Sequence, residues 1–244
     1  MLDCYYMNLN CDCSKEQSLA LYEKLSKDRK DKVDRLKQRE LADKQILIGA
    51  FLCHCLGNYL DTSLNRVEFE YNDRGKPFIK DSNLHFNLSH SGDYAVLAVS
   101  DYPVGIDIER LKYGRMSVAE RFFGKEEYED IINAGSEEKR NRRFLEYWTL
   151  KEAYVKYLGE GLAVSFDSFR INIASSVDIL VKEDKLFIDD SVKWIHDDKI
   201  YVKSFDFEHN YHIAVCGMKT AISQSSVYLS SIQHLKETCI YDIL

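Results

Sequence analysis

Proline and glycine are scarce in this chain, which has only 2 prolines and 11 glycines among 244 residues. Long flexible or extended linkers are rich in these residues, so the composition argues against disordered connections. No stretch approaches the roughly 20 apolar residues that a membrane-spanning helix needs. The formal net charge of −7 also lacks the basic excess that is typical of nucleic-acid-binding proteins. We therefore expect neither a membrane nor a nucleic acid among the partners.

The N-terminal stretch MLDCYYMNLNCDC lacks the basic region and apolar run of a secretion signal, so we expect a cytoplasmic protein with reduced thiols. The chain has 7 cysteines, and an odd number does not complete a disulfide framework. Cys11/Cys13 and Cys53/Cys55 are CxC pairs, whereas structural zinc sites typically use CxxC pairs. We expect free thiols, and a metal site is the alternative.

The residues that are abundant indicate a globular protein, since 45% are hydrophobic and 30% are charged. Alternation and periodicity predict an N-terminal strand, a long charged helical region and two further helical patterns, at 1–10, 15–57, 115–134 and 137–158. Further strands are predicted at 66–71, 84–89, 94–100 and 104–111, with a turn at 72–77. Short strand-like runs such as FRINI, WIHDDKIYVKSF and YHIAVCGM follow. The predicted fold class is α+β with antiparallel strands.

A first candidate for chemistry is the pair Asp107 and Glu109 in the predicted strand 104–111. Successive side chains of a strand point to opposite faces, so these two carboxylates project together while Ile106 and Ile108 face the core. Adjacent carboxylates repel each other unless a cation or protons lie between them, and Mg²⁺ is held by one or two carboxylates plus waters and phosphates. An edge strand with two solvated acids has the same pattern, so both interpretations stay open.

A second candidate is one face of the predicted helix 137–158. Trp148, Glu152 and Lys156 follow each other at four-residue spacing and therefore lie along that face. An ordinary surface ion pair between Glu152 and Lys156 explains part of this pattern. Trp148 and Tyr154 indicate burial of the helix, however, and charged groups near buried surface need partners.

A third candidate is the segment FNLSHSG at 86–92, which ends a predicted strand. Its tip offers a hydroxyl, an imidazole and backbone amides, a combination that suits an anion. A Ser89–His90 nucleophile pair is the alternative. Side chains of adjacent strand residues diverge, so the geometry of that pair is poor.

Taken together, the order and spacing of these segments resemble the 4′-phosphopantetheinyl transferase superfamily, in its two-lobed surfactin-synthetase-activating type. The resemblance runs from about residue 30 to residue 217. It is carried by FNLSHSG (86–92), VGIDIE (104–109) and WTLKEAYVKYLGEGL (148–162). Supporting matches are Gly75-Lys76-Pro77, Arg121-Phe122-Phe123 and Phe166-Asp167-Ser168-Phe169.

The resemblance implies two similar α+β lobes related by a pseudo-twofold axis, which we place at 1–102 and 103–244, the second carrying the magnesium and catalytic motifs. It implies a monomer that binds coenzyme A between the lobes and uses Mg²⁺. The implied activity is transfer of 4′-phosphopantetheine to a serine of an apo acyl or peptidyl carrier protein, with release of 3′,5′-ADP. A non-catalytic coenzyme A-binding or regulatory protein is the alternative. Such a protein should have lost a carboxylate, and none is missing.

On the matching positions, the resemblance makes Asp107, Glu109 and Glu152 the magnesium ligands and Glu152 the general base toward the acceptor serine. Lys156 would contact the pyrophosphate, and His90 would hydrogen-bond to it. The implied nucleotide positions are Gly75, Lys76, Pro77 and Ser89, with Lys32 and Arg39 for the 3′-phosphate.

Two positions leave questions within the resemblance. Gln45 stands where relatives often have a small hydroxyl residue, so one nucleotide contact is in doubt. Arg121-Phe122-Phe123 and Gly161-Leu162 are the implied contacts for the carrier protein, since such interfaces depend on a few apolar anchors. A core role is the alternative for at least one of Phe122 and Phe123.

Overall fold

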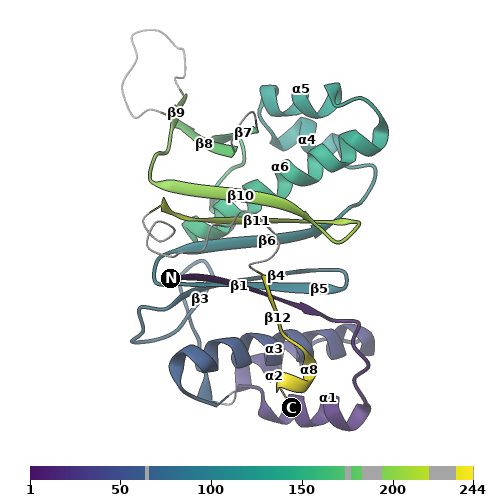
Figure 1. Ribbon diagram of the computed structural model, residues 1–244, viewed down its shortest axis with the longest axis vertical. Coiled ribbons are helices and arrows are strands. Elements are labelled where there is room, and N and C mark those ends of the chain that lie inside the picture. The colour runs from purple at the N-terminus through teal and green to yellow at the C-terminus, as the bar shows by residue number, and fades with distance from the viewer. Residues whose placement is uncertain (64–65, 174–176, 183–193, 220–234, 244) are drawn as a thin grey trace.

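The computed structural model describes residues 1–63, 66–173, 177–182, 194–219 and 235–243. Runs of helices and runs of mainly antiparallel strands follow each other along the chain, which confirms the predicted α+β class. Figure 1 shows strands through the middle of the molecule and helices at its two ends. Within the described ranges, no helix is long and apolar enough to cross a bilayer.

Three helices follow the first strand, β1 (Leu2–Asn8), where the sequence predicted one helical region. They are α1 (Lys15–Lys24), α2 (Lys27–Asp34) and α3 (Arg39–Leu60). Leu25 and Ser26 both have extended backbones, so α1 ends and α2 begins there. The apolar half of α3 is buried against the first sheet, as its composition predicted.

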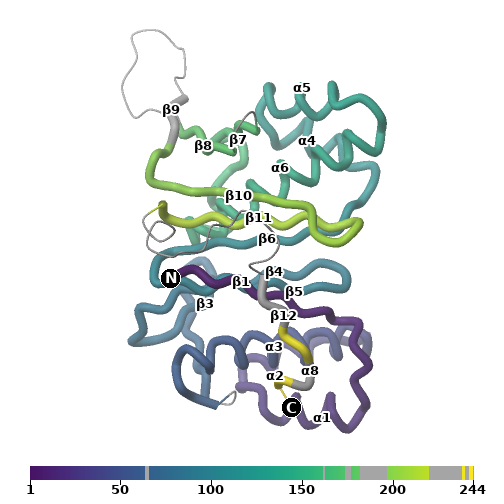
Figure 2. Tube along the Cα trace, viewed as in Figure 1, coloured from purple at the N-terminus to yellow at the C-terminus, as the bar shows by residue number. Residues whose placement is uncertain are grey.

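The first sheet has the strand order β12-β1-β5-β4. The strands β4 (His85–Ser91) and β5 (Tyr94–Ser100) form a hairpin near their predicted positions, and β12 (Leu235–Glu237) runs parallel to β1. Helix α8 (Ile240–Ile243) contacts α3, and Figure 2 shows it beside the N-terminal helices.

The predicted strand 66–71 is wrong for most of its length. Only Glu70–Tyr71 forms a strand, β2, and it pairs with the equally short β3 (Pro77–Phe78). Val67 and Phe69 contact the first hydrophobic core instead, so their alternation reflects core packing without a partner strand.

The second sheet has the order β10-β11-β6 and belongs to the later part of the chain. Its strands are β6 (Val104–Arg110), β10 (Ile200–Phe207) and β11 (Tyr211–Met218). The predicted run 194–205 is divided between β9 (Trp194–His196) and β10 by a turn in which Asp197 accepts the backbone N–H of Lys199. A further small sheet contains β7 (Phe169–Ile173), β8 (Val177–Lys182) and β9.

Helix α6 (Glu137–Leu158) covers one face of the second sheet, at its predicted position. The helix predicted at 115–134 is two helices, α4 (Met116–Phe122) and α5 (Lys125–Asn133). They separate at Gly124, the N-cap residue of α5, whose N–H donates a hydrogen bond to the Glu127 carboxylate at 2.7 Å. Gly105 lies against α6, where a Cβ atom would overlap the Ala153 carbonyl oxygen, so only glycine permits this close approach.

The two larger sheets meet along β4 and β6, and side chains of β4 bridge them. Asn87 Oδ1 accepts the backbone N–H of Ile106 at 2.8 Å, and Ser91 Oγ accepts that of Arg110 at 3.1 Å. A hydrophobic cluster that contains residues of both sheets lies beside this seam. Functional groups from β4 and β6 are therefore held next to each other.

Candidate active site

The two acids of β6 point toward β4. Ser89 Oγ donates a hydrogen bond to Asp107 Oδ1 at 2.7 Å, and Ser91 Oγ donates one to Glu109 Oε2 at 2.9 Å. Asp107 is only 3% exposed, so the alternative of two solvated acids on an edge strand is wrong for this residue. Ser89, which we predicted to lie beside the nucleotide, thus contacts a carboxylate in the structure.

Helix α6 brings a cation and a third acid to the same place. Lys156 Nζ lies 2.5 Å from Asp107 Oδ1 and donates to Ser89 Oγ at 2.9 Å. Glu152 lies one helical turn earlier, and its pKa is raised by burial and by the negative charges of Asp107 and Glu109. The structure thus brings these three acids into one electrostatic neighbourhood, and Lys156 forms its ion pair with Asp107.

The donor atoms of this cluster suit a hard divalent cation. Asp107 Oδ2 is buried and has no hydrogen-bond partner among the described residues. Burial also raises the pKa of Asp107, against the lowering effect of Lys156 and Ser89. An ion bound by these oxygens would use the free lone pairs of Asp107 Oδ2 and offset the repulsion between the carboxylates. The residues therefore fit Mg²⁺.

The metal-binding arrangement is not complete as the side chains stand. In the part of the chain that the structure describes, no three histidine, cysteine or acidic side chains are close enough together to hold a metal ion. The Lys156 ammonium occupies one side of the Asp107 carboxylate. A divalent ion would therefore require a shift of Lys156 or of the acids.

His90 lies beside the cluster, near the end of β4. Burial and the positive charge of Lys156 lower the pKa of His90, and the negative charge of Glu109 acts in the opposite direction. The lowered pKa favours a neutral imidazole. Gln45 Nε2, from α3, lies 3.5 Å from His90 Nε2. Gln45 thus contacts a site residue despite the missing hydroxyl at its position.

A cavity of about 590 Å³ opens in front of Glu152 and Lys156. One wall is the loop Gly75-Lys76-Pro77 from the first half of the chain, the segment for which we predicted nucleotide contacts. An apolar wall of the cavity contains Phe122, Trp148, Val155, Val164 and Phe166. The cavity is therefore built from both halves of the sequence.

The Lys76 ammonium is not directed at this cavity alone. It donates hydrogen bonds to the backbone carbonyls of Lys156, at 2.5 Å, and Val104, at 3.3 Å. Burial lowers the pKa of Lys76 to about 8. These two carbonyl oxygens therefore compete with a ligand for the Lys76 ammonium.

The two basic residues expected at the 3′-phosphate lie in different places. Lys32 Nζ donates to the hydroxyl of Tyr71 at 3.1 Å, whereas Arg39 lies 3.6 Å from Asp43 in a separate hollow on the surface. The residue close to Lys32 is Arg29, which sequence reasoning missed. Its guanidinium lies over the Phe69 ring at 5.1 Å, and its buried Nε has no hydrogen-bond partner among the described residues.

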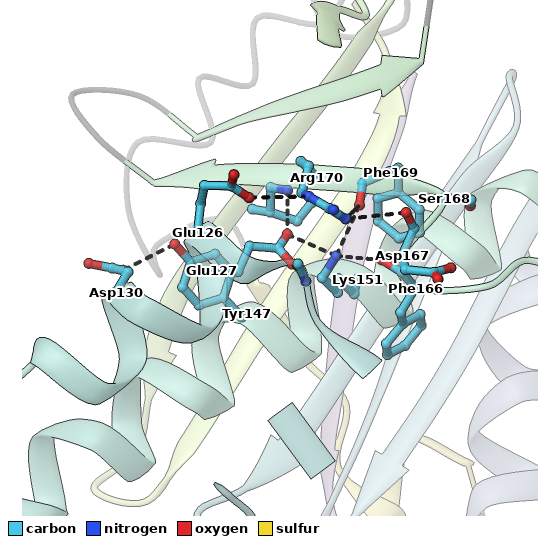
Figure 3. A network of polar contacts seen from close by, with 12 residues as sticks. Glu126, Glu127, Asp130, Tyr147, Lys151, Phe166, Asp167, Ser168, Phe169 and Arg170 are labelled. Atoms are coloured by element: carbon cyan, nitrogen blue, oxygen red, sulfur yellow. Dashed lines mark hydrogen bonds and ion pairs between the residues drawn. The ribbon is translucent and has the colours of Figure 1, made fainter. Parts of the chain in front are cut away.

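Sequence reasoning gave no role to Lys151, which precedes Glu152 in α6 and has different contacts. Its buried ammonium lies 2.8 Å from Glu127 Oε1 and donates a hydrogen bond to the Phe166 carbonyl oxygen at 2.9 Å (Figure 3). Glu127 Oε1 also accepts the N–H of Ile171 at 2.7 Å. This ion pair joins α5, α6 and the loop that carries Phe166 behind the apolar wall.

The residues implied in carrier binding divide between surface and core. Phe122 is 45% exposed and lines the cavity, whereas Phe123 is buried and stacks on Phe144 at a centroid distance of 5.5 Å. Gly161 also lines the cavity, and the side chain of Leu162 lies outside the described part of the chain. All 7 cysteines lie within the described residues, and none of them is joined in a disulfide.

Comparison with known proteins assigns the chain to one group. Residues 103–216 match the family model of the 4′-phosphopantetheinyl transferase superfamily, and residues 11–101 match the model for a 4′-phosphopantetheinyl transferase N-terminal region. The 4′-phosphopantetheinyl transferase ffp of Bacillus subtilis is 27% identical, with 93% of this chain and 96% of the relative covered. The transferase psf-1 of Bacillus pumilus is 32% identical over 74% of each chain.

Two further matches cover about half of the chain. The human L-aminoadipate-semialdehyde dehydrogenase-phosphopantetheinyl transferase is 35% identical over 53% of this chain and 48% of its own length. The crystal structure of the Thermotoga maritima holo-[acyl-carrier-protein] synthase aligns with a TM-score of 0.37 and 22% identity, covering 48% of this chain and 62% of that chain.

Proposed function

We propose, because this chain belongs to the 4′-phosphopantetheinyl transferase superfamily, that it transfers the 4′-phosphopantetheine arm of coenzyme A to a serine of an apo carrier protein. The observation that carries this proposal is the buried Asp107–Lys156 contact beside Glu152, at one end of a cavity built from both halves of the chain. Acids and a lysine in this arrangement suit a diphosphate.

The diphosphate of coenzyme A is proposed to bind at Lys156 and His90. Lys156 would neutralise charge that develops on the leaving 3′,5′-ADP, and a preorganised cation contributes strongly where water is excluded. Asp107, Glu109 and Glu152 would hold Mg²⁺, which when bound supplies further neutralisation of the phosphate oxygens. The unpaired Asp107 Oδ2 supports this assignment.

Glu152 is proposed as the general base. The acceptor serine oxygen forms a bond to the phosphorus that bears the pantetheine arm, while the bond from that phosphorus to the ADP oxygen breaks. The serine proton passes to the Glu152 carboxylate, directly or through a water. Its raised pKa supports this role, because a stronger base accepts a proton more readily, and the positive charge of Lys156 opposes the rise.

Arg29 and Lys32 are proposed as contacts of the 3′-phosphate, and Arg39 is not, because its surface hollow is separate from the other site residues. Arg29 packs its aliphatic stem near Gly49 of α3, one turn after Gln45, the contact of His90. Arg29 Nε lies 4.0 Å from Asp28 Oδ2 but has no hydrogen-bond partner among the described residues, and with the neighbouring Lys32 it supports binding of a dianion at this position.

This assignment predicts that Lys32→Met raises the KM for coenzyme A about tenfold or more, since a hydrogen bond to a charged group contributes roughly 1.5–3 kcal/mol. The KM for 3′-dephospho-coenzyme A should change little, because that substrate lacks the group in question. Arg39→Met is the matched control and should leave both constants unchanged. Steady-state kinetics with both substrates measure the effect, and an equal rise for both would remove Lys32 from this role.

One chain is proposed to suffice for the site, so the protein is expected to act as a monomer with lobes 1–102 and 103–244. The support is that the cavity takes Gly75 and Lys76 from the first lobe and Glu152 and Lys156 from the second. The two family models also meet between residues 101 and 103. A cytoplasmic location is proposed from the free thiols.

A further inference from the structure

The loop between β2 and β3 is held in one shape by a single asparagine. Asn72 Oδ1 accepts the backbone N–H groups of Arg74, at 3.0 Å, and Lys76, at 2.8 Å. Gly75 has a φ of +81°, a conformation that glycine adopts without strain. The loop therefore presents the side chains of Asn72 and Lys76 from a defined backbone.

Both side chains contact the C-terminal end of α6, which belongs to the other half of the chain. Lys76 Nζ donates to the Lys156 carbonyl oxygen at 2.5 Å, and Asn72 Nδ2 donates to that of Gly159 at 3.1 Å. The last four carbonyls of a helix lack partners within the helix, and a cation near them is favourable. The loop thus caps α6 from across the seam.

This cap lies at the residues that carry the chemistry. Lys76 binds the backbone oxygen of Lys156, the residue whose side chain reaches Asp107. The second carbonyl that Lys76 binds, at 3.3 Å, is that of Val104, where β6 begins. One ammonium therefore connects the end of α6 to the strand that carries Asp107 and Glu109.

We propose that Lys76 is a positioning residue, which fixes the last turn of α6 against β6 and so sets Lys156 and Glu152 relative to the acids of β6. This inference rests on the proposed function. The alternative is that the Lys76 ammonium binds the substrate directly. The two roles affect different kinetic constants, because a lost ligand contact weakens binding, whereas a displaced catalytic group slows the chemical step.

The test compares Lys76→Met and Asn72→Asp with the control Lys80→Met. Asn72→Asp keeps the oxygen that shapes the loop and removes the donor to Gly159, and Asn72 does not line the cavity. Lys80 is an exposed lysine next to β3 that pairs with Glu70 at 3.2 Å. A positioning role predicts that kcat falls in both test variants, by up to about 10²-fold for Lys76→Met, while the KM for coenzyme A changes less than about twofold.

Hydrogen exchange provides a second readout that does not need activity. The amides of the last turn of α6 should exchange faster in Lys76→Met and Asn72→Asp than in the wild type and in Lys80→Met. A tenfold rise in KM with unchanged kcat, or unchanged exchange in this turn, would overturn the proposal. An inactive wild-type protein would refute the proposed function alone, because the exchange result would still decide the role of Lys76. If Lys76→Met does not fold, Asn72→Asp decides both readouts.

Discussion

Glu152→Gln is expected to reduce transfer about 10²–10⁴-fold, which is the usual contribution of a general base. Glutamine has nearly the same shape but cannot take the serine proton, and it removes one of the three acids proposed for Mg²⁺. The catalytic rate should fall at every concentration of coenzyme A. The loss is measured as kcat for the modification of an apo carrier protein.

The same substitution should not destabilise the fold. The pKa of Glu152 is raised in the folded protein, so its ionised form is disfavoured there by burial and by Asp107. The stability that depends on its proton is present at low pH and is lost as the pH rises from the unfolded-state pKa through the folded-state pKa. Near pH 7, Glu152→Gln should therefore unfold at the same temperature as the wild type or above it.

Glu138→Gln is a matched control on the same helix, because Glu138 is exposed and pairs only with the surface residue Arg142 in the described contacts. This variant should keep full activity. Full activity of Glu152→Gln would remove Glu152 from the mechanism. A loss of both activity and folding would show that the residue is structural.

Lys156→Met is expected to affect both catalysis and stability. Without the ammonium, the buried Asp107 carboxylate loses its counter-charge, and removal of one partner of a buried ion pair costs roughly 3–5 kcal/mol. We expect a loss near the lower end, about 3 kcal/mol, because the lysine side chain is 26% exposed. Transfer should fall together with stability, since the cation at the diphosphate is missing.

Mg²⁺ should stabilise Lys156→Met more than the wild type, because the ion would replace the missing charge at Asp107 without displacing a lysine. Chemical denaturation with and without Mg²⁺ measures both effects. Lys125→Met, which removes an exposed lysine 3.8 Å from Glu129, is the control and should change the unfolding free energy by less than about 0.5 kcal/mol. A Lys156→Met protein as stable as the wild type without Mg²⁺ would contradict the role of this ion pair.

Local periodicity was sufficient to predict which site residues share one side of a strand or one face of a helix. Alternation in β6 correctly indicated that Asp107 and Glu109 share a side, and helical spacing placed Glu152 and Lys156 on one face of α6. These properties depend on backbone geometry over a few residues, and backbone geometry is regular within strands and helices.

Contacts between distant segments could not be predicted in this way. The hydrogen bonds from Ser89 to Asp107 and from Lys76 to the Lys156 carbonyl depend on how two sheets and a helix meet at the seam. Arg29 was passed over for the same reason, since it is one of several basic residues on α2 and only the tertiary structure buries it beside Phe69. The split of the predicted helix at Gly124 likewise depends on the carboxylate of Glu127, which is buried against Lys151.

The central claim is that the acids of β6 and α6, with Lys156, bind a metal–diphosphate and transfer the arm of coenzyme A. Its most direct test is mass spectrometry of apo acyl- and peptidyl-carrier proteins mixed with this protein and coenzyme A, with Mg²⁺ or with excess chelator. We predict that a carrier gains the mass of one phosphopantetheine group with Mg²⁺ and remains unmodified with chelator. An unmodified carrier in every Mg²⁺ reaction, or equal modification after chelation, would contradict the account.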